Sequence, residues 1–167
     1  MTIIDNKDEA ANCLRRLLGD WRGTGRGGFP TMNAFRYREV LNVSQGASTD
    51  SFHYLQRTWR LTPGGEAPSH EETGFIRVAE DGTVELLNAQ GTDRVEVLHG
   101  RMHRNSDGGW ELRLASVLHA HDERMRTASR TIRMQDQTLS YEMRMTTDRV
   151  ASEEPHLTAS LERDPSG

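Results

Sequence analysis

The sequence is poor in cysteine and lacks long apolar runs. Cys13 is the only cysteine among 167 residues, so neither an intrachain disulfide nor a metal site built from several thiolates can form. No stretch approaches the roughly eighteen consecutive apolar residues of a membrane helix, and residues 1–7 lack the basic start and apolar run of a signal peptide. We therefore expect a single cytoplasmic domain over residues 1–167.

The sequence also lacks a block of positive charge. Its formal net charge is −4, and its arginines are spread through strand-like runs beside acidic residues. A surface that binds nucleic acid or anionic lipid gathers Lys and Arg into one patch. We therefore expect neither nucleic acid nor a membrane as a partner.

Helical periodicity is confined to one segment near the start of the chain. Asn6 followed by Glu9 has the pattern of a capping box, and apolar residues then recur at helical spacing as far as Leu18. Gly19 stands where a glycine commonly ends a helix. The pattern predicts one short helix over residues 7–18.

The remaining sequence is typical of β-strands separated by Gly, Pro and polar turn clusters. Leu139, Tyr141, Met143 and Met145, for example, alternate with polar residues, which is the period-two pattern of a strand with two unlike faces. We predict about ten strands, near residues 20–26, 35–44, 51–61, 71–78, 83–90, 94–104, 110–118, 127–135, 139–147 and 156–163.

About ten successive antiparallel strands after one helix favour an all-β fold, an up-and-down barrel over residues 19–163. Such a barrel, like those of lipocalins and fatty-acid-binding proteins, removes exposed sheet edges and encloses one ligand. A two-sheet sandwich is the structural alternative. We expect only the tail, residues 163–167, to be disordered.

Residues 23–28 match the pattern GxGxxG, yet the helix precedes this segment instead of following it. A dinucleotide-binding loop needs the opposite order, so we interpret the glycines as a sharply bent first strand. We expect Trp21, between these glycines and the helix, to plug one end of the barrel rather than to contact a ligand.

Among the seven histidines, His156 stands at the start of the last predicted strand. Strict alternation places it on the same face as Thr158 and Ser160, and periodicity alone predicts that this face is exposed to solvent. If the face instead lines the lumen, its small side chains leave room for a flat cofactor. A neutral imidazole can then bind iron.

Several segments resemble the nitrobindins, a family of ferric-haem β-barrels that also occurs as the C-terminal domain of a human THAP-type protein. The first strand resembles the family motif GxWxGxG, and an aromatic-Pro-Thr sequence follows it. The segments that carry the resemblance are Gly19-Asp20-Trp21-Arg22-Gly23-Thr24-Gly25, Phe29-Pro30-Thr31, Phe35-Arg36-Tyr37-Arg38-Glu39, Ser69-His70-Glu71-Glu72-Thr73-Gly74-Phe75, Ala89-Gln90, Met143-Arg144-Met145 and Pro155-His156-Leu157.

This resemblance implies a five-coordinate ferric haem b with His156 as its proximal iron ligand and His70 on the distal side. It implies nitric oxide binding and isomerisation of peroxynitrite to nitrate, with His156 and His70 as the catalytic residues. Homodimers are common among such proteins. The haem contacts that it implies are Thr31, Ser69, His70, Gln90, Met145 and His156.

The sequence departs from the family pattern at the distal side and near the rim of the pocket. Ser69 replaces a longer apolar residue, Phe29 replaces a tyrosine, and Arg124 and Arg126 stand where some relatives have a lysine near the haem. An arginine can still pair with a haem propionate. The alternatives are a non-enzymatic carrier of a lipophilic molecule such as a fatty acid, which a buried Arg pair would favour, and a packed barrel without a ligand.

Overall fold

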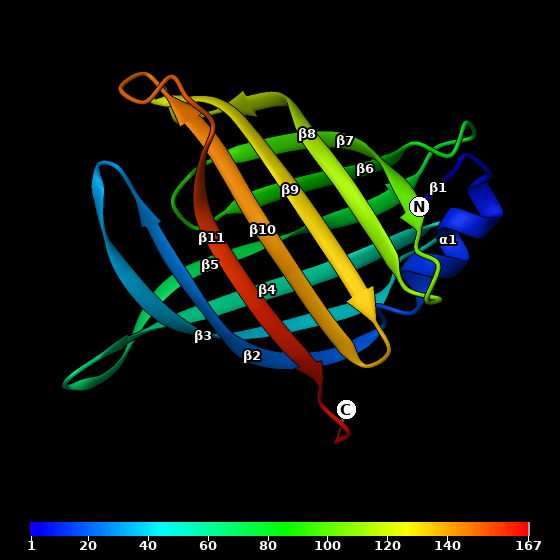
Figure 1. Ribbon diagram of the computed structural model, residues 1–167, viewed down its shortest axis with the longest axis horizontal. Coiled ribbons are helices and arrows are strands. Elements are labelled where there is room, and N and C mark those ends of the chain that lie inside the picture. The colour runs from blue at the N-terminus through cyan, green and yellow to red at the C-terminus, as the bar shows by residue number, and fades with distance from the viewer. Residues whose placement is uncertain (167) are drawn as a thin grey trace.

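The structure, a computed structural model, describes residues 1–166 and contains one helix and eleven strands (Figure 1). β1 (Thr2–Ile4) precedes α1 (Lys7–Arg15). The other ten strands follow in chain order: β2 (Gly19–Phe29), β3 (Met32–Gln45), β4 (Ser51–Thr62), β5 (Gly65–Val78), β6 (Val84–Gln90), β7 (Val95–Arg104), β8 (Trp110–Ala120), β9 (Met125–Gln135), β10 (Thr138–Thr147) and β11 (Glu154–Arg163).

Strands β2 to β11 form a closed antiparallel barrel. Each strand pairs with the next one along the chain, and β11 pairs back onto β2, with Ala159 opposite Gly25. The all-β, ten-stranded up-and-down barrel is therefore confirmed, and the sandwich alternative is wrong. β1, which the sequence did not predict, pairs with β7 beyond the end of β6 and buries Ile4.

Helix α1 covers one end of the barrel, and the β2–β3 and β10–β11 connections lie at the opposite, open end (Figure 1). The Asn6 side chain accepts a hydrogen bond from the Glu9 amide at 3.0 Å, as the capping box predicts. The helix ends at Arg15, earlier than the predicted residue 18, because the Leu17 amide bonds to the Leu14 carbonyl in a tighter final turn. Within residues 1–166, no helix is long and apolar enough to cross a membrane.

Trp21 fills the barrel below α1. Its side chain is fully buried, its indole N–H donates to the Leu17 carbonyl at 2.8 Å, and the Arg163 guanidinium lies 4.3 Å from its ring centre. The prediction that Trp21 plugs one end is confirmed. The predicted disorder of the tail is wrong for Arg163 and Asp164, which are hydrogen-bonded, whereas Gly167 lies outside the described residues.

The glycines of β2 allow close approach of the neighbouring strand. A Cβ atom added at Gly25 would lie 2.6 Å from the Thr158 carbonyl oxygen and 2.2 Å from the ring of Tyr37. Only a residue without a side chain fits this position. The interpretation of residues 23–28 as a structural device of the first strand is therefore consistent with the packing.

Candidate functional site

The open end of the barrel contains a cavity of about 300 Å³, which we call the mouth pocket. A second cavity of about 360 Å³, the side pocket, adjoins it. Arg94, Asp122, Arg124 and His156 line both. These volumes are within the usual range of small-molecule sites, so this end of the barrel is not a packed interior.

The structure places the predicted haem contacts around these two cavities. Ser69, His70, Gln90 and His156 line the mouth pocket. The other two, Thr31 and Met145, line the side pocket, where His156 also contributes. The other five residues thus lie on both sides of His156.

His156 is the extra residue of a β-bulge in β11. Its neighbours Pro155 and Leu157 pair with consecutive residues of β10, and His156 stands between those two pairs. The bulge turns His156 into the pocket while Thr158 and Ser160 remain exposed. The prediction that these three residues share a face is therefore wrong, since strict alternation does not hold across an inserted residue.

One hydrogen bond defines the protonation of the His156 ring. Nδ1 lies 3.1 Å from the carbonyl oxygen of Gly28. A carbonyl oxygen only accepts, so Nδ1 carries the proton and Nε2 keeps its lone pair. Burial lowers the pKa of His156 from its ordinary value, and the positive charge of Arg94 lowers it further. The pocket therefore presents a neutral imidazole with a free Nε2, which is the form that binds a metal.

His70 lies on β5 beside a second bulge. Thr58 pairs with His70 and Trp59 pairs with Pro68, so Ser69 is the inserted residue. The Nε2 atom of His70 is 3.2 Å from the Oε2 atom of Glu72. A carboxylate accepts, so Nε2 donates and the ring is held against the pocket wall.

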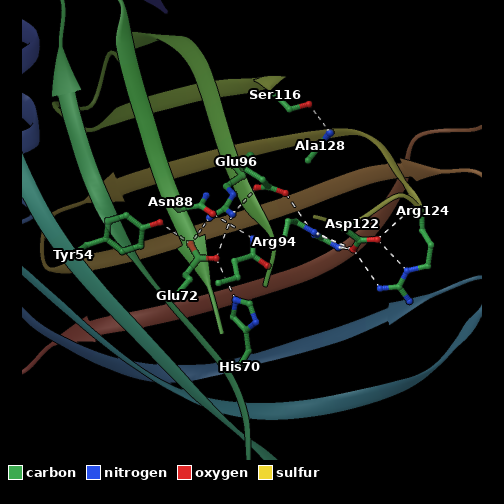
Figure 2. Close-up of polar contacts among 12 residues, drawn as sticks. Tyr54, His70, Glu72, Asn88, Arg94, Glu96, Ser116, Asp122, Arg124 and Ala128 are labelled. Atoms are coloured by element: carbon green, nitrogen blue, oxygen red, sulfur yellow. Dashed lines mark hydrogen bonds and ion pairs between the residues drawn. The ribbon is translucent and has the colours of Figure 1, made fainter. Parts of the chain in front are cut away.

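Glu72 is the centre of a buried polar cluster that the sequence did not reveal. Its Oε1 atom accepts from the Tyr54 hydroxyl at 2.9 Å and from Arg130 Nη1 at 2.6 Å. Figure 2 shows Tyr54 and His70 pointing toward Glu72 from different sides. Burial opposes ionisation of Glu72, but the charge of Arg130 and the bond from His70 hold its pKa well below the ordinary value. The carboxylate stays charged and available to both neighbours.

Arg130 brings the positive charge into this cluster. It is 7% exposed and also pairs with Glu96, whose Oε2 atom lies 3.2 Å from Nη2. The sequence carried a signal for it, because Arg130 stands in phase with the inward residues Ala128 and Met134 of β9. Since two carboxylates already balance its charge, a fatty-acid carboxylate would meet a neutralised guanidinium.

A second cluster of charges forms the rim shared by the two pockets. Asp122 accepts from Arg94 at 2.7 Å and from Arg124 at 3.0 Å, and Figure 2 shows this chain of contacts. The bonds from Arg124 and Arg94 hold the pKa of Asp122 well below its usual value. Arg126, in contrast, lines neither pocket and bonds to the backbone carbonyls of Glu123 and Met125. Of the two arginines expected near the haem, Arg124 is the one at the pocket.

A buried carboxyl group, Glu39, lies next to the mouth pocket and bonds to two of its lining residues, Tyr141 and Gln56; the sequence also did not single it out. Tyr141 donates to its Oε2 atom at 2.6 Å, and Gln56 donates to its Oε1 atom at 2.7 Å. Burial raises the pKa of Glu39 to about 7, although both hydrogen bonds oppose the shift. Glu39 lines a third space of about 70 Å³, which we call the inner cavity.

Comparisons with a family model, with related sequences and with a solved structure all point to one family. Residues 10–163 match the family model of the THAP4-like, heme-binding β-barrel domain. A protein of Arabidopsis thaliana named peroxynitrite isomerase Rv2717c is 37% identical over 150 residues, covering 90% of this chain and 86% of its own length. The peroxynitrite isomerase of Nocardia farcinica is 35% identical over 160 residues, covering 90% of this chain and 89% of its own.

The crystal structure of Rv2717c from M. tuberculosis superposes with a TM-score of 0.83 at 28% identity, covering 93% of this chain and 97% of that one. The family match spans most of the chain, and the solved structure shares the barrel. The resemblance to nitrobindins is thereby confirmed: the chain belongs to the family of THAP4-like, heme-binding β-barrel domains.

Proposed function

We propose that this barrel binds haem b through His156 and isomerises peroxynitrite to nitrate. The observation that carries the proposal is the geometry of His156, a bulged residue whose Nδ1–H is bonded to Gly28 and whose Nε2 is free. The relatives named peroxynitrite isomerase, at 35% and 37% identity, support the choice of reaction. The cytoplasmic location and the homodimer stay predictions.

The residues at the open end fit a haem. A neutral imidazole is a common axial ligand of haem iron in proteins, and cavities lie on two sides of this one. Arg94 and Arg124 stand at the rim, where guanidinium groups suit the two propionates. When bound, the ferric iron supplies a Lewis acid that polarises the peroxo oxygen of peroxynitrite.

The chain itself contributes orientation and a hydrogen-bonding group. The bond to Gly28 fixes the plane of the His156 ring, and Phe29 packs against it edge-on with ring centres 6.0 Å apart. On the other wall, Glu72 accepts a hydrogen bond from Nε2 of His70 and so holds the His70 ring in one orientation. His70 lines the mouth pocket, and its Nδ1 is the ring nitrogen left for a ligand there.

Visible spectroscopy tests the binding claim. The protein is expressed with a supply of haem, and we expect a Soret band at one haem per chain, lost or shifted in His156→Ala. His99→Ala is the matched control, because His99 is 43% exposed and pairs with Glu85 away from the pockets. A wild type without stoichiometric haem, or His156→Ala with an unchanged Soret band, would contradict the proposal.

The activity claim needs a separate measurement. Stopped-flow traces of peroxynitrite decay should accelerate in proportion to added holo-protein, and the acceleration should fall in His156→Ala. Mass spectrometry of the purified protein addresses the carrier alternative. A co-purified fatty acid in place of haem would contradict the isomerase proposal and favour the lipid carrier.

A further inference from the structure

The inner cavity lies between the mouth pocket and the end of the barrel that α1 covers. Four residues, Gln56, Glu72, Tyr141 and Met143, line both spaces and form the wall between them. The rest of the lining is mostly branched aliphatic. These aliphatic residues are Leu17, Leu41, Val43, Ile76, Leu86, Ile132 and Leu139.

Three further lining residues, Glu39, Tyr54 and Arg130, are polar, and they bond to the polar groups of the dividing wall. Glu39 is occupied by Tyr141 and Gln56, and Glu72 is occupied by Tyr54 and Arg130. Among residues 1–166, the buried side-chain atom that lacks a partner and belongs to a lining residue is Arg130 Nε. An ordered water needs about two to four polar partners, so the inner cavity is a poor site for water.

Size and rigidity limit what the cavity can accept. Its 70 Å³ exceeds the roughly 10–15 Å³ that one water occupies by the same measure, yet it is too small for a fatty acid. Leu86, Leu139 and Val43 are each at most 3% exposed and belong to the strands of a closed sheet. Apolar cavities with such walls bind small apolar molecules.

We propose that the inner cavity is a docking site for one small uncharged molecule, of the class of nitric oxide and dioxygen. Its use as a store of nitric oxide rests on the proposed function, because the shared wall places a docked diatomic next to the haem pocket. Docking itself depends only on the apolar walls. The apoprotein is therefore sufficient to test it.

Met143 provides the route between the two spaces. It lines both cavities from β10, and its unbranched side chain rotates without breaking a hydrogen bond of the wall. Gln56, Glu72 and Tyr141, in contrast, are fixed by the contacts described above. Exchange of a diatomic through this point leaves the two polar clusters intact.

Xenon is the probe, since it is uncharged and similar in size to a diatomic gas. We expect methyl resonances of Val43 and Leu86 in the apoprotein to shift saturably under xenon pressure. Crystals under xenon should show an anomalous peak inside the inner cavity. Leu86→Phe and Leu139→Phe place extra carbon atoms in the cavity and should each abolish the shifts of the remaining lining methyl groups.

Leu87→Phe is the matched control, because Leu87 is the next residue on β6 and is not part of the lining. It should leave xenon binding unchanged. Xenon found only in the mouth pocket, ordered water filling the inner cavity, or unchanged shifts in both filling variants would overturn the proposal. Failure of haem binding would leave the xenon result intact, so the two proposals fail separately.

Discussion

The Nε2 atom of His70 lies 3.2 Å from the Oε2 atom of Glu72, two residues further along the same strand. Glu72 in turn pairs with Arg130, so a histidine at the pocket wall is connected to a buried ion pair. The His70 ring is thereby held by a carboxylate that is itself fixed by a buried arginine. The arrangement makes Glu72 the residue on which both the stability of the barrel and the orientation of His70 depend.

Glu72→Gln should destabilise the protein by about 3 kcal/mol, because it leaves the buried Arg130 with one carboxylate in place of two. Glu71→Gln is the control: Glu71 is the neighbouring residue and pairs with Arg57 on the surface, where such a bond contributes less than about 1 kcal/mol. Urea unfolding measures both. Equal losses in the two variants would argue against a special role for the buried pair.

Glu39 should make the stability depend on pH. Its pKa is raised to about 7 in the folded protein, from an ordinary value of 4.5, so the folded state binds more protons than the unfolded state between these values. Stability should therefore fall as the pH rises from about 4.5 to 7, by up to about 3 kcal/mol.

The comparison with Glu39→Gln isolates this effect. The variant keeps a side chain of the same shape but cannot ionise, and the nearby groups His70 and Glu72 are present in both proteins. The unfolding free energy of Glu39→Gln minus that of the wild type should increase between pH 5 and pH 8. A difference that stays constant across this range would show that Glu39 is not the source of the pH dependence.

Gly25→Ala should destabilise the barrel by about 1–3 kcal/mol, because the added methyl group would meet the Thr158 carbonyl and the Tyr37 ring. Gly28→Ala is the matched control on the same strand. Its Cβ would lie 3.5 Å from the nearest atom, an ordinary contact, so its effect should be within about 0.5 kcal/mol. Thermal unfolding of both variants checks the prediction, and a tolerated Gly25→Ala would contradict the close approach of β2 and β11.

The sequence predicted the barrel because its signal is repeated. Alternation in strands such as β10 and turn glycines such as Gly82 and Gly108, both with positive φ, specify one strand after another. β1 has only three residues, which is too short for any period to emerge. Its pairing with β7 comes from tertiary contacts.

The details of the site were less predictable for a different reason. The bulges at Ser69 and His156 each insert one residue into a strand, and neither changes composition or the turn signals around it. Resemblance identified the two histidines, but alternation gave the wrong face for His156. Glu72 and Glu39 become buried only when strands distant in sequence meet, so their clusters required the structure.

Two arginines near the rim offer a test of how the protein holds the haem propionates. Arg124 lines both pockets and pairs with Asp122, whereas Arg126 lines neither pocket and bonds to the backbone carbonyls of Glu123 and Met125. Arg124→Gln should weaken haem binding by about 1 kcal/mol, about fivefold, since an exposed guanidinium contributes little more than this to a propionate.

Arg126→Gln should leave the affinity unchanged, because the same charge is removed two residues away without loss of a pocket contact. Transfer of haem to excess apomyoglobin, followed by absorbance, measures the rate of haem loss from each variant. The Arg124 variant should lose haem faster than the wild type. Equal rates in the two variants would show that the propionates do not contact Arg124, and would assign the cationic side of the rim to Arg94 alone.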